Sequence, residues 1–381
     1  MTGKSGPENW GSRARQTVLR PLFPGATGEG ARPVARLTGM RITVPAGGVG
    51  AARFLRGLKA ELPGAEITVI GNTGDDITLF GLHVSPDLDT VMYTLGGGID
   101  EEQGWGRADD SRRVLSELAA YGAGPGWFGL GDLDIATHLH RTSMLAAGLP
   151  LSAATAVLCQ RWQPGVRLLP MTDDRVETHV VLAGDESERR AGAGAERGGG
   201  DNSAGAGAER GGGEKTVHFQ EWWVRMGAQV PAARFVFAGA AQASPAPGVL
   251  EAIAEADVIL MPPSNPVVSI GTILAVPGIA EAMRAKTVVG VSPIIGGAPV
   301  RGMADKCLAA LGVAATAAGV AAHYGPVLLD GWLVDEQDKA AADAPELAGI
   351  TVRAAPLYMS SPAATAAIAR AALDLAMELR A

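Results

Sequence analysis

The sequence has few cysteines and no long hydrophobic run. Its two cysteines, Cys159 and Cys307, lie far apart and in no CxxC or Cys/His spacing, so neither a disulfide framework nor a zinc site is indicated. No uninterrupted apolar stretch reaches the roughly 18 residues that cross a bilayer, and the N-terminus lacks the apolar segment of a signal peptide. We therefore expect a cytoplasmic protein that does not bind a membrane.

Positive charge is also scarce. Lysine and arginine total 32 against 40 acidic residues, which gives a formal net charge of −8. Proteins that bind nucleic acid or anionic membranes need a basic surface, so we expect neither as a partner. The 47% hydrophobic and 19% charged content is typical of a globular protein, and 381 residues suffice for a substantial core.

Two stretches lack the apolar residues that a core needs. Residues 1–39 have the Gly, Pro, Ser and Arg content of a disordered extension, and residues 184–214 contain GAGAERGGG twice, which indicates a disordered loop. Residues 177–182 and 215–224 flank that loop and are predicted to form a pair of strands. We expect one domain over 40–381, with a helical and hairpin subdomain inserted at 110–235.

The folded part repeats one local pattern: a short apolar strand, a loop of small residues and a helix. RITV at 41–44 precedes AGGVG and a helix with apolar residues at helical spacing, and EITVIG at 66–71 is a second buried strand. The pattern returns at 256–274, 286–302 and 350–354. Repeated strand–loop–helix units predict an α/β fold with a doubly wound, Rossmann-like, mostly parallel sheet.

The most informative segment is NTGDDITLFGLHVSPDLDT, residues 72–90, which follows a predicted strand and holds Asp75, Asp76, Asp87 and Asp89 within fifteen residues. Two like charges about 4 Å apart repel by roughly 4 kcal/mol at an effective dielectric near 20. Such carboxylates must be spread out in water, protonated or bound to a cation. The alternative is a solvated acidic loop. We favour Mg²⁺, because it prefers oxygen ligands and because ligands bind at the carboxyl ends of parallel strands.

Three loops of small residues, AGGVG, PPSNP and SPIIGG, also follow predicted strands. The GGxG spacing is not the GxGxxG dinucleotide fingerprint, so NAD and FAD are not expected. Each loop could serve packing or helix capping alone. Three such loops at one sheet edge instead favour a binding site for a nucleotide that carries a diphosphate. The candidate residues are Gly47, Gly48, Gly50, Asn72, Ser264, Asn265, Ser292, Gly296 and Gly297.

From about Met40 to the C-terminus, the chain resembles the CofD/FbiA transferases of coenzyme F-420 biosynthesis. The resemblance is carried by GGVGAARFLRGL, NTGDD, SPDLDTVMYTLGGGID, GLGDLDIATHLHR, LLPMTDDRVETHV, FQEWWV, PSNPVVSIG and SPIIGGAPVRGMADK. It implies transfer of a phospho-linked three-carbon acid from a guanosine-diphosphate-activated donor to the deazaflavin Fo, with Mg²⁺ and release of GMP. GGGIDEEQGWG, RWQPGVRLLP and LLDGWLVDE resemble actinobacterial members. These segments imply an enolpyruvyl donor and a dehydro product, with the lactyl donor as the alternative.

The resemblance also implies site residues. It places the metal on Asp75, Asp76 and Asp89, with Asp87 weaker because an Asp after Pro86 often makes a turn. Asp89 and Asp76 are the candidates for the general base. The residues implied for Fo binding are Asp89, Thr90, Tyr93, Trp105, Asp132, His138 and Arg141.

Other residues stay ambiguous within the resemblance. His140 lies on a different helix face from His138, and on a strand only one of Trp222 and Trp223 would face a ligand. Arg301 and Lys306 could bind phosphate or simply be solvated. Three positions depart from the family pattern, namely Leu133, Pro262 and Thr272.

Family members are typically dimers, so a homodimer is expected. Two other functions remain open: a non-catalytic nucleotide- or flavin-binding regulator, and a sugar-nucleotide-dependent transferase of other specificity.

Overall fold

The computed structural model describes residues 38–184 and 214–381. The disorder expected for 1–39 and 184–214 therefore falls almost entirely outside the described residues. These described residues form one compact unit. In the two described ranges, no helix combines the length and the apolar character needed to span a membrane.

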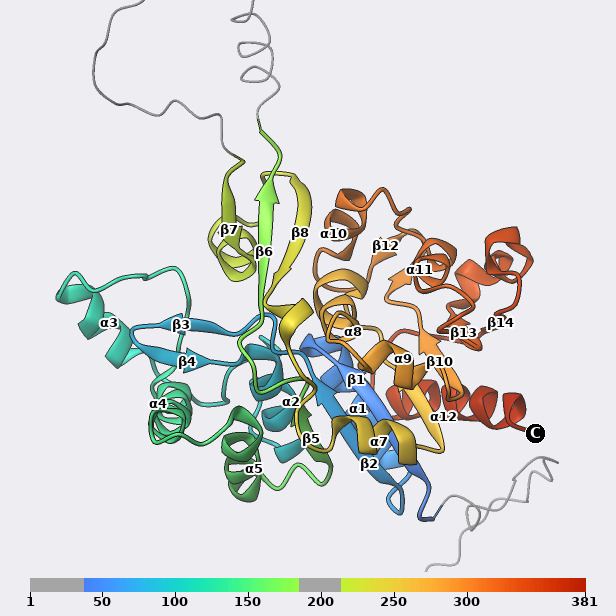
Figure 1. Ribbon diagram of the computed structural model, residues 1–381, viewed down its shortest axis with the longest axis horizontal. Helices are drawn as coiled ribbons and strands as arrows, with labels where there is room; N and C mark the ends of the chain where they lie inside the picture. Colours follow the sequence, from blue (N-terminus) through green and yellow to red (C-terminus); the bar gives the residue numbers. More distant parts are fainter. Residues whose placement is uncertain (1–37, 185–213) are drawn as a thin grey trace, which may run out of the picture. The chain divides into compact units, whose positions relative to one another are not determined.

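A seven-stranded sheet lies at the centre of this unit, and every neighbouring pair of its strands is parallel. The strand order is β14–β13–β10–β9–β1–β2–β5 (Figure 1). From β1 the chain adds strands on one side and then, from β9, on the other, so β1 and β9 flank the topological switch point. This confirms the predicted doubly wound α/β fold. The strands are β1 (Arg41–Ala46), β2 (Glu66–Gly71), β5 (Arg167–Pro170), β9 (Val258–Met261), β10 (Val288–Val291), β13 (Gly331–Val334) and β14 (Thr351–Ala354).

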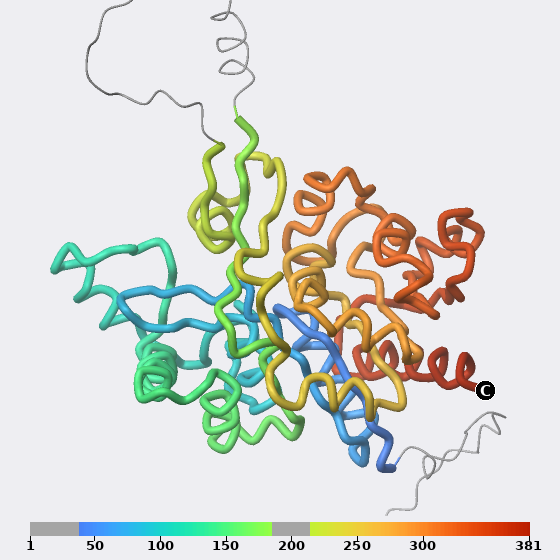
Figure 2. The backbone as a smooth tube through the Cα atoms, viewed as in Figure 1, coloured from blue at the N-terminus to red at the C-terminus, as the bar shows by residue number. Residues whose placement is uncertain are grey.

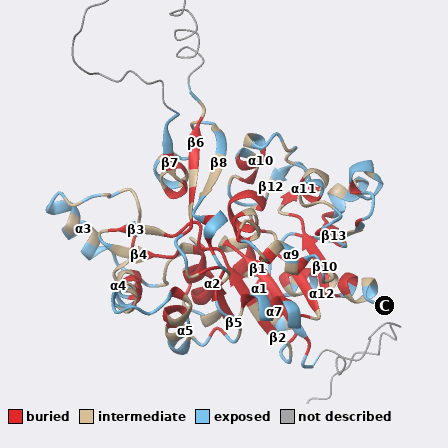
Figure 3. Cartoon of the chain, in the orientation of Figure 1, coloured by how far each residue is buried: buried red, intermediate tan, exposed pale blue. Residues whose placement is uncertain are grey.

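Helices cover both faces of the sheet. Successive residues of β9 show this directly, because Val258 and Leu260 belong to one hydrophobic core and Ile259 and Met261 to the other. Figure 3 accordingly shows the central strands as buried. On the first face pack α1 (Gly48–Glu61), α2 (Pro86–Gly96) and α12 (Pro362–Leu379), with α1 lying against α12 (Figure 2). On the second pack α7 (Val249–Glu255), α9 (Ile279–Met283), α10 (Ala304–Ala310) and α11 (Ala317–Tyr324).

The segment between β2 and β9 builds additional structure beside the sheet. It contains a hairpin, β3 (Ile77–Leu79) with β4 (Leu82–Val84), and a three-stranded antiparallel sheet in the order β7–β6–β8. Its other elements are β6 (Glu177–Leu182), β7 (Thr216–His218), β8 (Ala232–Ala238), α3 (Arg113–Ala120), α4 (Asp132–Ala146) and α5 (Leu151–Trp162).

The predicted pairing of residues 177–182 with 215–224 is correct for β6 and β7, but the second strand was predicted too long. β7 ends at His218, and Glu221–Arg225 form a short π-helix, η2. Strands β5, β8 and β13 were not predicted. β5 and β13 are as short as β9 and β10, but no loop of small residues follows them to mark them as strands.

The remaining elements are short and lie beyond β8. They are η3 (Ala240–Gln242), η4 (Pro266–Gly271), α8 (Thr272–Leu274), β11 (Ile294–Ile295), β12 (Ala298–Pro299), η5 (Glu336–Asp343) and η6 (Pro345–Leu347).

Candidate active site

The loops after β1 and β9 are in contact at the switch point. The Ser264 hydroxyl donates to the Gly47 carbonyl at 2.9 Å. A Cβ on Gly50 would lie 2.4 Å from the carbonyl oxygen of Pro263. Close packing therefore accounts for the glycine at position 50, which is the packing alternative considered for AGGVG.

The N-terminus of α1, where a phosphate was predicted to bind, has a carboxylate of the chain beside it. A Cβ on Gly47 would lie 2.6 Å from Asp87 Oδ2. The same Oδ2 accepts a hydrogen bond from Asn72 Nδ2 at 2.9 Å. A carboxylate is stabilised there by the helix dipole. A phosphate at Gly47–Gly50 would have to displace Asp87.

The other predicted nucleotide contacts also have partners in the protein. Asn265 caps η4, since its Oδ1 accepts from the N–H groups of Val267 and Val268. Ser292 Oγ donates to the carbonyl of Ile294 at 2.8 Å, and the Gly296 N–H donates to Asp338 Oδ2 at 2.9 Å. Gly297 has φ +80° in the turn between β11 and β12, a conformation that favours glycine.

The four carboxylates of residues 72–90 are buried, each between 4% and 7% exposed. The alternative of a solvated acidic loop is therefore wrong. Asp76 Oδ2 accepts from Ser85 Oγ at 2.7 Å and lies 2.9 Å from His83 Nε2. We call Asp75, Asp76 and Asp87 the acidic cluster.

Burial perturbs all three members of the acidic cluster. It raises the pKa of Asp75 well above its ordinary value, and the neighbouring Asp87 adds to the shift. It raises the pKa of Asp76 against the opposing effect of His83 and Ser85, and it raises the pKa of Asp87 to about 6. Four buried side-chain oxygens have no hydrogen-bond partner within the described part of the chain, and three of them lie in or beside the acidic cluster: Thr73 Oγ1, Asp75 Oδ1 and Asp76 Oδ1. Unpartnered buried oxygens with suppressed charge fit a cation site.

Asp89, unlike the acidic cluster, has no free oxygen to offer a cation. Both of its oxygens accept from the two Nη groups of Arg141, with Nη1–Oδ2 at 3.0 Å, and Arg141 is 1% exposed. This is a buried bidentate ion pair. A metal ion on Asp89 would have to compete with Arg141.

A cavity of about 150 Å³ lies between α2, α4 and η2, and we call it the aromatic cavity. Its aromatic lining comes from Tyr93, Trp105, Phe128 and Trp223. Its polar lining comes from Asp89, Thr90, Asp134, His138 and Gln220. Gln220 Nε2 lies 3.5 Å from Asp75 Oδ2, so the cavity adjoins the acidic cluster.

The structure brings five of the seven predicted Fo-binding residues to this cavity: Asp89, Thr90, Tyr93, Trp105 and His138. Arg141 does not line it, but contacts two residues that do, Asp89 and His138. Asp132 does not line it, because its carboxylate accepts from Ser111 Oγ at 2.5 Å and the Val114 N–H at 3.0 Å, at the start of α3. These bonds hold the pKa of Asp132 below its ordinary value.

Sequence reasoning missed Asp134, Phe128 and Gln220. Asp134 was detectable, because it precedes His138 by four residues and therefore shares its helix face. Trp223 lines the aromatic cavity, whereas Trp222 is fully buried in the core with Nε1 donating to the Val230 carbonyl at 2.8 Å.

Arg301 and Lys306, the two ambiguous cations, donate to backbone carbonyls. Their acceptors are Gln103 and Ala228, respectively.

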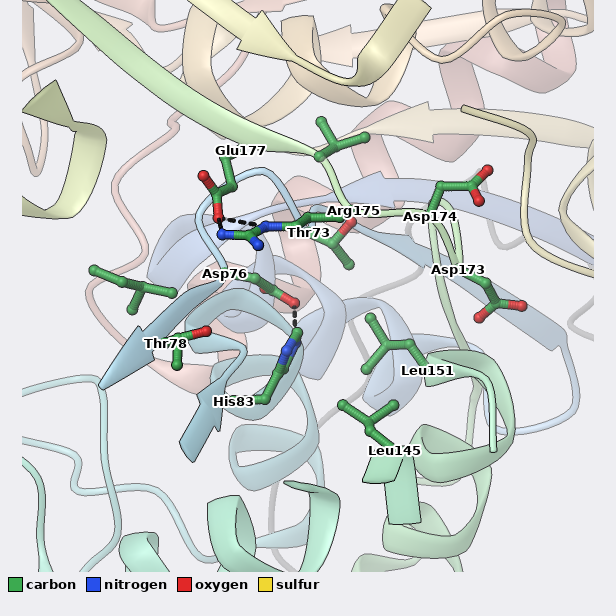
Figure 4. Close-up of a pocket in the computed structure, with 12 residues that line it drawn as sticks. Thr73, Asp76, Thr78, His83, Leu145, Leu151, Asp173, Asp174, Arg175 and Glu177 are labelled. Carbon is green, nitrogen blue, oxygen red and sulfur yellow. Dashed lines mark hydrogen bonds and ion pairs between the residues drawn. The ribbon is translucent and has the colours of Figure 1, made fainter. Parts of the chain in front are cut away.

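Asp76 lines a second cavity of about 220 Å³, which we call the polar cavity. In Figure 4 the Asp76 and His83 side chains point toward each other, and Arg175 pairs with Glu177 nearby. The two carboxylates predicted as catalytic, Asp76 and Asp89, thus face different cavities.

One further group could hold a metal ion. Asp89, Asp134 and His138 are buried and have ligand atoms within 4.8 Å of one another; among the residues that the structure describes, this is the one group of three His, Cys, Asp or Glu that meets the distance. The acidic cluster is therefore not a preassembled triad.

Comparison of the sequence with known proteins points to one family. The family model for the 2-phospho-L-lactate transferase CofD matches residues 42–352. A protein from Thermobifida fusca named phosphoenolpyruvate transferase is 64% identical over 350 residues, covering 90% of this chain and 99% of that protein. Proteins with the same name from Streptomyces griseus and Nocardia farcinica are 64% and 52% identical, each covering 90% of this chain and 100% and 97% of their own lengths.

A solved structure of a UPF0052 family protein from Bacillus halodurans has a similar fold. It superposes with a TM-score of 0.54 at 18% identity, covering 88% of this chain and 99% of that chain. At this identity the similarity bears on the fold alone.

Proposed function

The chain belongs to the CofD family of transferases, and on that premise we propose that it is a phosphoenolpyruvate transferase of coenzyme F-420 biosynthesis. It transfers enolpyruvyl phosphate from enolpyruvyl-diphosphoguanosine to the ribityl hydroxyl of Fo, giving dehydro-F-420-0 and GMP. The main support for this proposal is a sequence identity of 52–64% with relatives named phosphoenolpyruvate transferase, over nearly the whole length of those relatives. The lactyl donor is not favoured by any relative described above, although the family model takes its name from it.

The aromatic cavity is the proposed site for Fo. A flat tricyclic ring suits walls made by Tyr93, Trp105, Phe128 and Trp223. The ribityl chain would then extend along Thr90 toward Asp89 and Gln220, and Gln220 adjoins Asp75. This arrangement would deliver the terminal hydroxyl to the acidic cluster, where the donor's diphosphate is expected.

We place Mg²⁺ on Asp75 and Asp76. The support is the pair of unpartnered buried oxygens, Asp75 Oδ1 and Asp76 Oδ1, with Thr73 Oγ1 close in sequence. When bound, the ion would offset negative charge on the diphosphate. We leave Asp87 and Asp89 out of the metal set, since Asp87 lies against the start of α1 and Asp89 pairs with Arg141.

The reaction proposed here is an in-line displacement. The ribityl oxygen attacks the phosphorus that carries the enolpyruvyl group, the bond from that phosphorus to the bridging oxygen breaks, and GMP leaves with that oxygen. The hydroxyl proton passes to a carboxylate. We assign this role to Asp89 rather than Asp76, because Asp89 lines the aromatic cavity and Asp76 does not.

The donor's guanosine diphosphate remains assigned to the switch-point loops, with Ser264, Asn265, Ser292 and Gly296–Gly297 as its candidate contacts. Gly47, Gly48 and Gly50 would join only after Asp87 moves away from α1. Asn72, which donates to Asp87, would move with it.

A cytoplasmic homodimer also stays a proposal, supported by the family resemblance. Sedimentation of the purified protein would test the dimer, and a monomeric mass at micromolar concentration would reject it.

The test of the proposed function is GMP release that depends on Fo. Purified protein is incubated with Mg²⁺ and enolpyruvyl-diphosphoguanosine, with and without Fo, and GMP is quantified by chromatography. We expect stoichiometric GMP only in the presence of Fo and metal. A non-catalytic regulator would bind Fo without releasing GMP, and a transferase of other specificity would neither bind Fo nor respond to it.

A further inference from the structure

Asp134 is a buried carboxylate for which no role was predicted from the sequence. It lies on the first turn of α4, is 7% exposed and lines the aromatic cavity. The backbone of that turn is fixed, because the N–H groups of Leu133 and Asp134 both donate to the carboxylate of Asp110, at 2.8 and 3.0 Å. The position of Asp134 is thus well defined.

Asp134 begins a chain of buried contacts that ends at Asp89. Tyr93 Oη donates to Asp134 Oδ1 at 2.8 Å, and Asp134 Oδ2 lies 3.4 Å from His138 Nε2. On the other side of the ring, His138 Nδ1 lies 3.3 Å from Arg141 Nη1 and 3.6 Å from Asp89 Oδ2. His138 and Arg141 are each 1% exposed. These two side chains are therefore almost fully shielded from bulk solvent.

The contact with Arg141 favours one tautomer of the His138 ring. An arginine guanidinium only donates hydrogen bonds, so His138 Nδ1 must accept from Arg141 Nη1. A neutral imidazole has a single N–H, which is then at Nε2 and faces Asp134. A doubly protonated ring would instead direct Nδ1–H at the N–H groups of Arg141.

The Nε2–Oδ2 contact is long, and Nε2 makes no well-formed hydrogen bond within the described ranges. Hydrogen bonds at catalytic sites are often long before the substrate binds and shorten in the complex.

We propose that Asp134 is a positioning residue that acts through His138. This proposal rests on the proposed function. Asp134 holds His138 as the Nε2–H tautomer, so that Nδ1 is free to accept a hydrogen bond from Arg141. That hydrogen bond in turn fixes the orientation of the Arg141–Asp89 ion pair. His138 then takes no proton from the ribityl hydroxyl. Asp89 receives it, in an orientation set by the contacts behind it.

The same residues are the group whose ligand atoms would suit a metal ion. The hydrogen-bonded reading is favoured because Arg141 already places a positive charge against both oxygens of Asp89. The two readings give different results in a spectroscopic experiment that needs no turnover.

That experiment is ¹⁵N NMR of protein labelled at its six histidines. The His138 resonances are identified by their loss in His138→Asn. We expect an unprotonated Nδ1 and a protonated Nε2 at neutral pH in the wild type, and a changed tautomer balance in Asp134→Asn. A doubly protonated ring, an Nδ1–H tautomer, or selective broadening of His138 by Mn²⁺ would overturn the proposal.

Kinetics test the positioning role. Asp134→Asn is expected to lower kcat by about 10-fold or more, while the dissociation constant for Fo, read from its fluorescence, changes by less than about 3-fold. His138→Asn, which can place an amide oxygen near the Nδ1 position, should retain more activity than His138→Gln. The exposed His140→Asn on the same helix is the matched control and should match the wild type.

Three kinetic outcomes would overturn the proposal: wild-type kcat in Asp134→Asn, higher activity in His138→Gln than in His138→Asn, or equal loss in Fo binding and kcat. If Asp134→Asn does not fold, the two His138 variants and the wild-type spectrum still decide. A wild type that releases no GMP at all would defeat the proposed function, and the ¹⁵N result would stand separately.

Discussion

At the scale of residues, burial of the acidic cluster is the main finding, because it shows that acidic side chains whose sequence resembles a surface loop are instead candidate ligands for a cation. The spacing of the aspartates in sequence predicted the cluster. It did not predict that Asp87 would lie against the N-terminus of α1 or that Asp89 would pair with Arg141, because both contacts depend on how α1, α2 and α4 pack.

The first prediction concerns the metal. Asp75→Asn or Asp76→Asn should lower turnover by at least about 100-fold, comparable to removing one group that stabilises transition-state charge. Either substitution should also abolish the increase in Tm that the wild type shows when Mg²⁺ and GDP are added. The control is Asp374→Asn, an exposed residue of α12. Normal activity and a normal Mg²⁺ response in both cluster variants would remove the metal from this position.

The second prediction concerns pH. Burial raises the pKa of Asp87 from 3.8 to about 6. A raised pKa means that its stabilising contribution is present at low pH and is lost as pH rises through about 6. Between pH 5 and 7.5, Asp87 should thus reduce the unfolding free energy of the metal-free protein by about 1.4 kcal/mol, because the rest of the roughly 3 kcal/mol is already lost below pH 5.

Asp87→Asn should remove that part of the slope, measured by denaturant unfolding across the range. An unchanged slope in the variant would mean that Asp87 does not titrate there.

The third prediction concerns Asp89. Asp89→Asn should abolish turnover and also destabilise the fold by about 3–5 kcal/mol, because it leaves the Arg141 guanidinium buried without its counter-charge. Restoring neutrality with Asp89→Asn/Arg141→Met should recover part of the stability but none of the activity. Recovery of activity in the double variant would exclude Asp89 as the proton acceptor.

At the scale of elements, close approach of α1 to the loop after β9 shapes the switch point. Gly50→Ala would place a Cβ 2.4 Å from the Pro263 carbonyl, a backbone atom that must move. We expect a loss of about 1–3 kcal/mol in unfolding free energy and weaker GDP binding by calorimetry. Gly126→Ala, where no atom lies within 4 Å, is the control. Equal stability of the two variants would show that the approach is not tight.

Apolar strands that precede a loop of small residues were predicted, and some strands without such a loop were missed. β1, β2, β9 and β10 are apolar runs followed by small-residue loops, so the sequence could place them and the edge where their loops meet. β5 and β13 have no such loop after them, and the π-helix η2 continues a stretch with strand-like composition. The direction of the Asp132 side chain was also not predictable from the sequence. The turn at the start of α4 directs the Asp132 carboxylate toward α3 and the Asp134 carboxylate toward the aromatic cavity.

At the scale of the whole molecule, the doubly wound topology explains why residues far apart in sequence meet. The switch point between β1 and β9 brings Gly47 to Ser264, and the segment between β2 and β9 brings Tyr93, Asp134 and Trp223 around one cavity. The sequence predicted the topology from repeated units and the family from its motifs. It could not predict that Asp76 and Asp89 face separate cavities, because the directions of these two side chains depend on tertiary packing and not on the local sequence.

The central claim is that this chain places enolpyruvyl phosphate on Fo. The most direct test offers the protein Fo, Mg²⁺ and an equal mixture of the enolpyruvyl and lactyl guanosine-diphosphate donors, and weighs the deazaflavin product by mass spectrometry. We predict one dominant product, Fo plus an enolpyruvyl phosphate. A product heavier by the two hydrogens of the lactyl group would contradict the donor assignment, and unmodified Fo would contradict the function itself.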